Sequence, residues 1–169
     1  MSNGNTAVRH PFYFRSGGEE IHPVSGDWPA DWTPDDLYGA LLHVWCRETC
    51  APRLRTRWSE ADPTVGQCSV TAFLAQDIFG GDVFGVPLPD GGIHCYNAVR
   101  GSVFDLTDAQ FLPEKLEYPC LHPQDRAVHF AKEEKRNRYI CLSDRLKQFC
   151  SGRGMNESKE DLSPLGEER

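Results

Sequence analysis

The stretch that decides the fold is IHCYNAVRGSVFDL, residues 93–106. Two short runs of β-branched and aromatic residues flank Arg100 and Gly101, a pattern typical of antiparallel strands joined by a two-residue turn. Such a turn places Val99 opposite Ser102, and the register of the whole hairpin follows from that pair. The sequence therefore predicts antiparallel strands over residues 83–88, 93–99 and 102–106.

This register brings two polar side chains of the hairpin together. His94 and Asp105 fall on one face of the ribbon with Tyr96 and Thr107, because strand side chains alternate with period two. His94 and Asp105 are diagonal neighbours, about 7 Å apart at the backbone, so imidazole and carboxylate can meet. A three-residue turn would instead put them on opposite faces. Cys95 points to the other face, and we expect it in the core.

Cys68 opens a predicted helix. It follows Gly66 and Gln67 and precedes apolar residues at helical spacing, which end at a Gly-Gly pair at 80–81. At a helix start the unpaired backbone N–H groups and the dipole favour the thiolate, which is the nucleophilic form of cysteine. The same N–H groups can donate to an oxyanion on an attacked carbonyl. A lone cysteine here could equally be a core residue of the helix start.

Cys68, His94 and Asp105 together have the composition of a nucleophilic relay. The histidine would accept the thiol proton, and the aspartate would hold the imidazole in place. We expect acyl transfer on a small-molecule or peptide amide or thioester, without a cofactor or metal. Water as acceptor would give hydrolysis, and an amine would give amide formation. Side chains expected at the oxyanion or substrate site are Gln67, Trp58 and Tyr96.

Several motifs resemble the YunG family of small bacterial proteins. They are Gly66–Ala72, Gly92–Asn97, Asp105–Thr107, the string Trp58-Ser59-Glu60 and the predicted helix from Thr33 to Trp45. The resemblance covers residues 33–150. More remotely, the order of cysteine on a helix, histidine on a strand and aspartate on the next strand is similar to the transglutaminase-like and papain-like enzymes. This resemblance implies Cys68 as nucleophile, His94 as base and Asp105 as orienting acid.

The organisation along the chain indicates an α+β fold, and the resemblance implies that this fold is of the papain/transglutaminase-like kind. N-terminal helices begin at the cap Thr33-Pro34, and the Cys68 helix would pack on a small antiparallel sheet. We expect an N-terminal arm over residues 1–32, one domain over 33–150 and a disordered acidic tail over 151–169.

Composition limits the classes of partner. The chain has 169 residues, a formal net charge of −7 and seven cysteines. An acidic chain without a basic stripe is a poor candidate for nucleic acid or an anionic membrane. No secretory signal is visible at the N-terminus, so we expect a reducing cytoplasm, where thiols stay unpaired. The sequence does not predict an oligomeric state.

Two other functions are open. His43, Cys46 and Cys50 have the spacing of one helix face and could bind zinc, although tighter ligand clusters are usual for structural zinc. A chain with this fold could also be a non-catalytic binding or partner protein. The basic residues at positions 132, 135, 136 and 138 are interleaved with glutamates, which favours a solvated helix face.

Overall fold

The computed structural model describes residues 9–160, with side chains described through residue 152. In chain order its elements are β1 (Tyr13–Arg15), α1 (Pro34–Val44), the 3-10 turn η1 (Pro52–Leu54), α2 (Cys68–Phe79), β2 (Asp82–Pro87), β3 (Ile93–Val99), β4 (Ser102–Asp105), the 3-10 turn η2 (Asp108–Phe111), α3 (Arg126–Phe130) and α4 (Glu133–Glu160).

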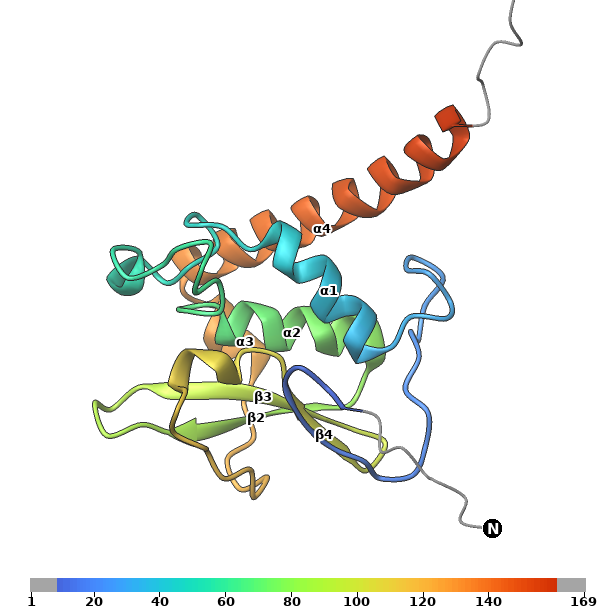
Figure 1. The fold of residues 1–169 in the computed structure, drawn as a ribbon. Helices are drawn as coiled ribbons and strands as arrows, with labels where there is room; N and C mark the ends of the chain where they lie inside the picture. The colour runs from blue at the N-terminus through green and yellow to red at the C-terminus, as the bar shows by residue number, and fades with distance from the viewer. Residues whose placement is uncertain (1–8, 161–169) are drawn as a thin grey trace, which may run out of the picture.

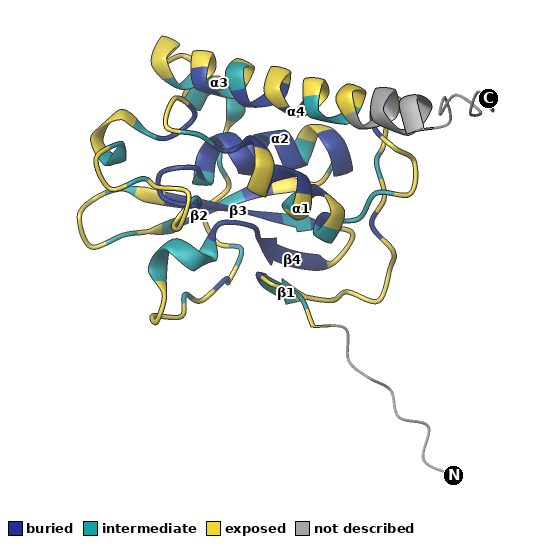
Figure 2. Ribbon diagram, turned by 45° about the horizontal axis from the view of Figure 1, so that its top comes forward, coloured by how far each residue is buried: buried dark blue, intermediate teal, exposed yellow. Residues whose placement is uncertain are grey.

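The strands form one antiparallel sheet, and helices cover one of its faces. The strand order is β1-β4-β3-β2. Helices α1, α2 and α4 lie on the same side of this sheet, with α2 next to the strands (Figures 1 and 2). The expected α+β class, with the cysteine-bearing helix on a small antiparallel sheet, is confirmed. Among the described residues no helix is long and apolar enough to cross a membrane.

The β3–β4 hairpin has the register that its sequence predicts. Val99 pairs with Ser102, and only two residues connect the strands. Arg100 and Gly101 have φ angles of +50° and +81°, the left-handed values that a tight two-residue hairpin turn requires. The face of β3 opposite His94 is turned toward α2, where the Asn97 side chain donates to a backbone carbonyl at 2.8 Å.

The main core lies between the sheet and the helices. Figure 2 shows α2 buried over most of its length, because it lies between the strands and the other two long helices. Leu74 and Ile78 of α2 are in one cluster with Leu142 and Leu146 of α4. The side of α4 that carries Leu142 and Leu146 is therefore the side by which this helix packs on the domain.

Replacing Leu142 by alanine is expected to lower the free energy of unfolding by about 2–5 kcal/mol, because the leucine is fully buried and a cavity would remain. Urea unfolding followed by circular dichroism measures the change. Ile140→Ala is the matched control on the same helix, since Ile140 is 47% exposed. A loss for Leu142→Ala no larger than for the control would contradict this packing of α4.

The segment expected to be an arm contributes a strand and core side chains. Phe14 of β1 pairs with Phe104 of β4, and Phe12, Ile21 and Trp28 are buried. At the other end, α4 continues to Glu160, so the disordered tail expected from residue 151 is not found over 151–160. Once packing holds the first part of a helix, each further residue adds one backbone hydrogen bond, and this favours extension of the helix. The remaining parts of the expected arm and the expected tail, residues 1–8 and 161–169, lie outside the described residues.

Candidate active site

Cys68 is the first residue of α2 and lines a cavity of about 780 Å³. Gly66, just before it, has a φ of +70°, and a Cβ there would lie 2.5 Å from the Sγ of Cys50. Only glycine fits this close approach, so the chain can turn sharply into α2. The Cys68 side chain is partly exposed, and its Sγ lies 4.0 Å from the carbonyl oxygen of Ile93.

His94 of β3 is buried beside the same cavity. Its Nε2 lies 2.6 Å from Oδ2 of Asp105, and an edge-to-face contact with Phe111 at 4.7 Å fixes the ring plane. Nδ1 has no hydrogen-bond partner among the described residues besides the Cys68 thiol, whose interaction with the ring raises the pKa of His94. The nitrogen bound to the carboxylate carries a proton, so Nδ1 is the atom left to exchange a proton with that thiol.

Asp105 ends β4 and is satisfied on both oxygens. Oδ2 also accepts from the hydroxyl of Tyr118 at 2.7 Å, while Oδ1 accepts from Thr107, through its backbone N–H at 3.0 Å and its hydroxyl at 3.3 Å. These donors fix the carboxylate that holds His94. Sequence reasoning missed Tyr118, because it lies in a proline-broken stretch that carries no periodic signal.

The electrostatics of the site favour a thiolate and an imidazolium. Hydrogen bonds from the side chains of Cys95 and His94 lower the pKa of Cys68, although burial opposes this. For His94, burial lowers the pKa, but the charge and hydrogen bond of Asp105, together with Cys68, outweigh it and raise the pKa to about 10. Both shifts favour the ion pair between the Cys68 thiolate and the His94 imidazolium over the neutral pair.

Cys95 has a place in the site that its sequence position did not suggest. It packs in the core against Ala72, Phe73 and Val83, as expected for a side chain that faces α2. Its thiol also hydrogen-bonds to Cys68, which raises the pKa of Cys95 well above the ordinary value. Cys95 is thus the protonated partner that donates to the Cys68 thiolate, in addition to being a core residue.

The three side chains expected at the oxyanion or substrate site do not line the cavity. Gln67 is buried, with Nε2 donating to the Cys46 carbonyl at 3.0 Å, and the indole N–H of Trp58 donates to the Pro63 carbonyl at 3.0 Å. The hydroxyl of Tyr96 accepts from the backbone N–H of the residue at position 120. These polar groups are engaged within the fold, Gln67 and Trp58 as donors and Tyr96 as an acceptor, so the structure gives all three structural roles.

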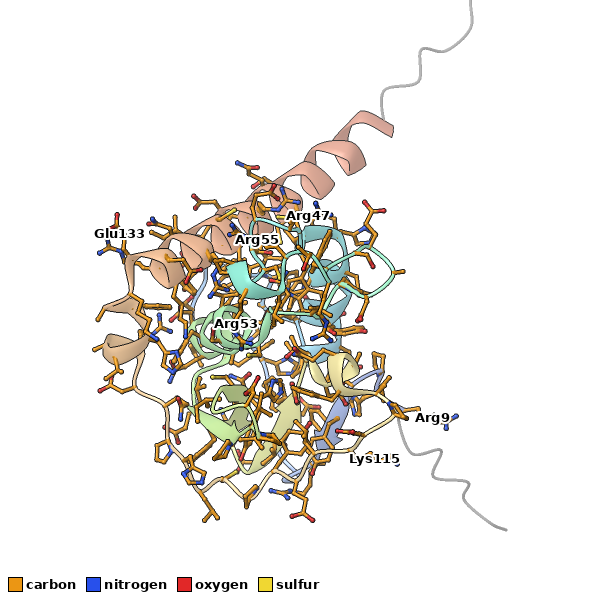
Figure 3. All side chains as sticks on the ribbon, turned by 90° about the vertical axis from the view of Figure 1, so that its left-hand side faces the viewer. Arg9, Arg47, Arg53, Arg55, Lys115 and Glu133 are labelled. Carbon is orange, nitrogen blue, oxygen red and sulfur yellow. The ribbon has the colours of Figure 1, made fainter. Side chains whose placement is uncertain are left out.

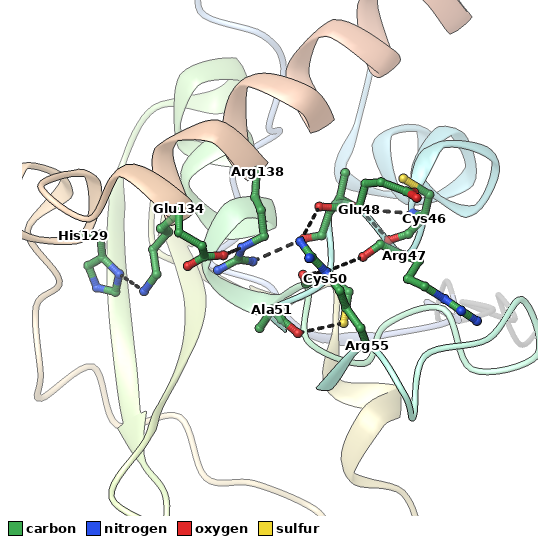
Figure 4. Close-up of polar contacts among 11 residues, drawn as sticks. Cys46, Arg47, Glu48, Cys50, Ala51, Arg55, His129, Glu134 and Arg138 are labelled. Atoms are coloured by element: carbon green, nitrogen blue, oxygen red, sulfur yellow. Dashed lines mark hydrogen bonds and ion pairs between the residues drawn. The ribbon is translucent and has the colours of Figure 1, made fainter. Parts of the chain in front are cut away.

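The opposite wall of the cavity comes from α3 and α4. Nζ of Lys135 lies 2.9 Å from Nδ1 of His129, and Nε2 of that ring lies 2.8 Å from Oε1 of Gln124. Figure 4 marks the contact at Nδ1 of His129 with a dashed line. Burial and the neighbouring Lys135 lower the pKa of His129 to about 4, so the ring is neutral. A neutral ring that accepts from the ammonium group leaves the positive charge of Lys135 intact.

A second set of contacts holds the loop that follows α1. The guanidinium of Arg138 bonds to Glu134 and donates to the carbonyl oxygen of Thr49, and Arg55 donates to carbonyls of residues 47, 48 and 50 (Figure 4). These bonds tie the 46–51 segment to α4 and to the C-terminal end of η1. The loop that Gly66 contacts is thereby fixed beside the start of α2.

The zinc alternative loses its geometric basis. Helix α1 ends at Val44, so Cys46 and Cys50 lie in the following loop and do not share a helix face with His43. The ring of His43 stacks on Phe149 instead. Within residues 9–160 no group of three or more histidine, cysteine or acidic side chains is placed to hold a metal ion.

Comparison with known proteins identifies the family. Residues 33–151 match the family model described as YunG protein. The chain belongs to the YunG family. A relative from Bacillus subtilis (strain 168), Uncharacterized protein YunG, is 45% identical over 71 residues, which are 42% of this chain and 56% of that protein. The match thus spans little more than half of the relative's own length. No solved structure matches the chain.

The matched YunG region contains the whole Cys68–His94–Asp105 arrangement and Tyr118. Strand β1 lies before it, although it pairs with β4 and the backbone N–H of Tyr13 donates to Asp108. The part of the chain that precedes the YunG match therefore completes the edge of the sheet on which Asp105 lies.

Proposed function

We propose that this YunG chain is a cysteine-dependent acyltransferase or amide hydrolase that works through a thioester on Cys68. The observation that carries the proposal is the state of His94. Its Nε2 is held by Asp105 at 2.6 Å, while its Nδ1 has no partner other than the Cys68 thiol, on a ring that lines the same cavity. A base oriented in this way beside a thiolate at a helix start has the parts that nucleophilic acyl transfer requires.

The proposed reaction has two balanced halves. The thiolate attacks the carbonyl carbon, the new S–C bond forms and the carbonyl electrons move to oxygen. When this intermediate collapses, the bond to the leaving group breaks and His94 gives its Nδ1 proton to the departing amine or thiol. Water or an amine then attacks the thioester, His94 takes a proton from it, and breakage of the S–C bond restores the Cys68 thiolate.

The oxyanion would be stabilised by backbone rather than by a side-chain amide. Cys68 occupies the first position of α2, where N–H groups have no partner within the helix. Such donors, aimed at the developing charge, contribute strongly in a site with little water. This assignment keeps the Cys68 N–H expected from the sequence and leaves out Gln67, whose side chain is engaged elsewhere.

The wider relationship and the compartment are part of the same proposal. The order of cysteine at a helix start, histidine on β3 and aspartate on β4 supports a remote relationship to transglutaminase-like and papain-like enzymes. No disulfide joins the seven cysteines, all of which lie within the described residues, and this supports a reducing cytoplasm and a small-molecule or peptide substrate met there.

Incubation with a small thioester, S-acetyl-N-acetylcysteamine, is expected to give an acetyl adduct on Cys68, located by mass spectrometry of peptides. The adduct should disappear in Cys68→Ala and remain in Cys141→Ala, the control that removes a partly exposed cysteine of α4. Equal acetylation of Cys68 and the other six thiols would count against the proposal and favour a binding protein of this fold.

A further inference from the structure

The cavity beside Cys68 is cationic, although the chain carries a net charge of −7. Its wall holds five cationic side chains, Arg53, Arg57, Lys132, Lys135 and Arg138, against two carboxylates, Asp90 and Glu134. The cations come from two parts of the chain, the η1 region and the start of α4. Figure 3 shows η1, which carries Arg53, in front of the N-terminal end of α2, the end at which Cys68 lies.

Internal partners leave much of this positive charge free. Arg138 is paired with Glu134, but Arg53 and Asp90 are 3.8 Å apart with both side chains about 60% exposed, a pair that contributes little. No described residue forms a hydrogen bond or ion pair with the side chain of Arg57 or Lys132.

Lys135 adds a third charge to the same wall. Its only hydrogen-bonded partner within the described chain is the neutral ring of His129, at 2.9 Å. Lys135 is half-buried, and burial lowers its pKa, whereas the nearby Cys95 and Cys68 raise it. The expectation of a solvated face holds for Lys132, which is exposed although it lines the cavity, but not for the half-buried Lys135.

Like charges that converge on one concave wall repel one another unless an anion lies between them. A cleft lined by one sign of charge also raises the local concentration of ligands of the opposite sign. Guanidinium and ammonium groups that are not engaged within the fold are the usual partners of carboxylate and phosphate oxygens. The wall therefore has the chemistry of a subsite for an oxyanion, placed next to the candidate nucleophile.

We propose that the acyl substrate of Cys68 carries an oxyanion group, a carboxylate or a phosphate, which binds between Arg57 and Lys132. This inference rests on the proposed function, since it names the substrate class of the same site. Arg53 and Lys135 flank the two residues and add to the field. The substrate class narrows from any amide or thioester to an anionic one, such as an acyl compound with a second, free carboxylate.

Two maleimides that differ in charge test the subsite directly. N-Ethylmaleimide is neutral, and 3-maleimidopropionate carries a carboxylate a few atoms from the reacting carbon. The rate constant for labelling of Cys68 by each is measured on the full chain at pH 7 by peptide mass spectrometry. We expect the ratio of the charged to the neutral rate constant to fall about fivefold in Arg57→Gln/Lys132→Gln, and in the wild type when salt rises from about 0.05 to 0.5 M.

The matched control removes two charges outside the cavity. Arg136→Gln/Lys147→Gln changes two exposed residues of α4 that do not line it, and the wild-type ratio should be kept. A ratio that is equal in the wild type and in Arg57→Gln/Lys132→Gln would overturn the inference. Glutarate and inorganic phosphate are then added as competitors. The competitor that slows labelling by 3-maleimidopropionate more shows whether the subsite prefers a carboxylate or a phosphate.

The same data separate this inference from the proposed function. Fast labelling of Cys68 by N-ethylmaleimide without charge discrimination overturns the anionic subsite and leaves the nucleophile in place. Slow labelling of Cys68, no faster than the other thiols but with the expected ratio, supports the anion site and contradicts the nucleophile.

Discussion

Replacing His94 by glutamine is expected to slow hydrolysis of a small thioester by about 10²- to 10⁴-fold, the usual contribution of a positioned acid and base. The variant loses the group that protonates the leaving thiol and deprotonates the incoming water. It also loses a partner that lowers the pKa of Cys68. Turnover is measured at pH 7 with S-acetyl-N-acetylcysteamine, and circular dichroism checks that the variant is folded.

The pH dependence of Cys68 labelling gives a test that needs no variant. The pKa of Cys68 is lowered and that of His94 is raised to about 10, so the ion pair exists between these two values. Labelling by N-ethylmaleimide should therefore be nearly constant from about pH 7 to pH 9 in the wild type. In His94→Gln it should rise with pH toward an ordinary thiol pKa of about 8.5. A wild-type rate that rises tenfold per pH unit over this range would contradict the thiolate.

The hairpin and the pair it positions could be predicted because local sequence determines them. Arg100 and Gly101 fix a two-residue turn, and the period of two then places His94 and Asp105 on one face. The 2.6 Å contact between these side chains follows from that register. The start of α2 at Cys68 is equally local, since the apolar spacing and the preceding glycine define it.

The parts that could not be predicted depend on contacts between distant segments. Strand β1 has three residues and pairs with β4 about 90 positions later, so no periodic pattern marks it. Tyr118 reaches Asp105 from a proline-rich segment that only the tertiary fold brings back. Cys95 was correctly placed on the α2 side of the sheet. Its contact with Cys68, however, depends on where α2 begins over β3, and the sequence does not show this.

The cationic wall was missed for a related reason. Lys132 and Lys135 alternate with glutamates along α4, and this pattern is typical of a solvated face. The sequence does not show that Arg57, more than 70 positions earlier, faces the same cavity. Charges that look balanced along one helix can therefore be unbalanced across a cavity built from two segments.

Replacing Asp105 by asparagine is expected to lower the rate of thioester hydrolysis by about 10³- to 10⁴-fold. Both carboxylate oxygens accept hydrogen bonds, so an amide must turn its NH₂ group toward one set of donors. The Thr107 backbone N–H can only donate, which favours an asparagine with its oxygen there and its NH₂ group toward His94. Nε2 of the ring must then accept, and the proton moves to Nδ1. The ring can no longer take a proton from the thiol or from water.

A stability measurement and a neighbouring variant separate this effect from general damage. We expect Asp105→Asn to lower the free energy of unfolding by about 1–3 kcal/mol in urea, because buried donors lose a charged acceptor. The raised pKa of His94 gives a stabilisation that is present below about pH 6.5 and is lost as the pH rises through about 10. The difference in unfolding free energy between wild type and Asp105→Asn should therefore be measured near pH 6.

Asp108→Asn is the control: burial and the charge of Asp105 raise the pKa of Asp108 to about 6, and asparagine can still accept from the backbone N–H of Tyr13. Equal losses of activity in the two variants would mean that Asp105 acts only through the fold, whereas a loss confined to Asp105→Asn identifies it as the residue that sets the protonation state of His94.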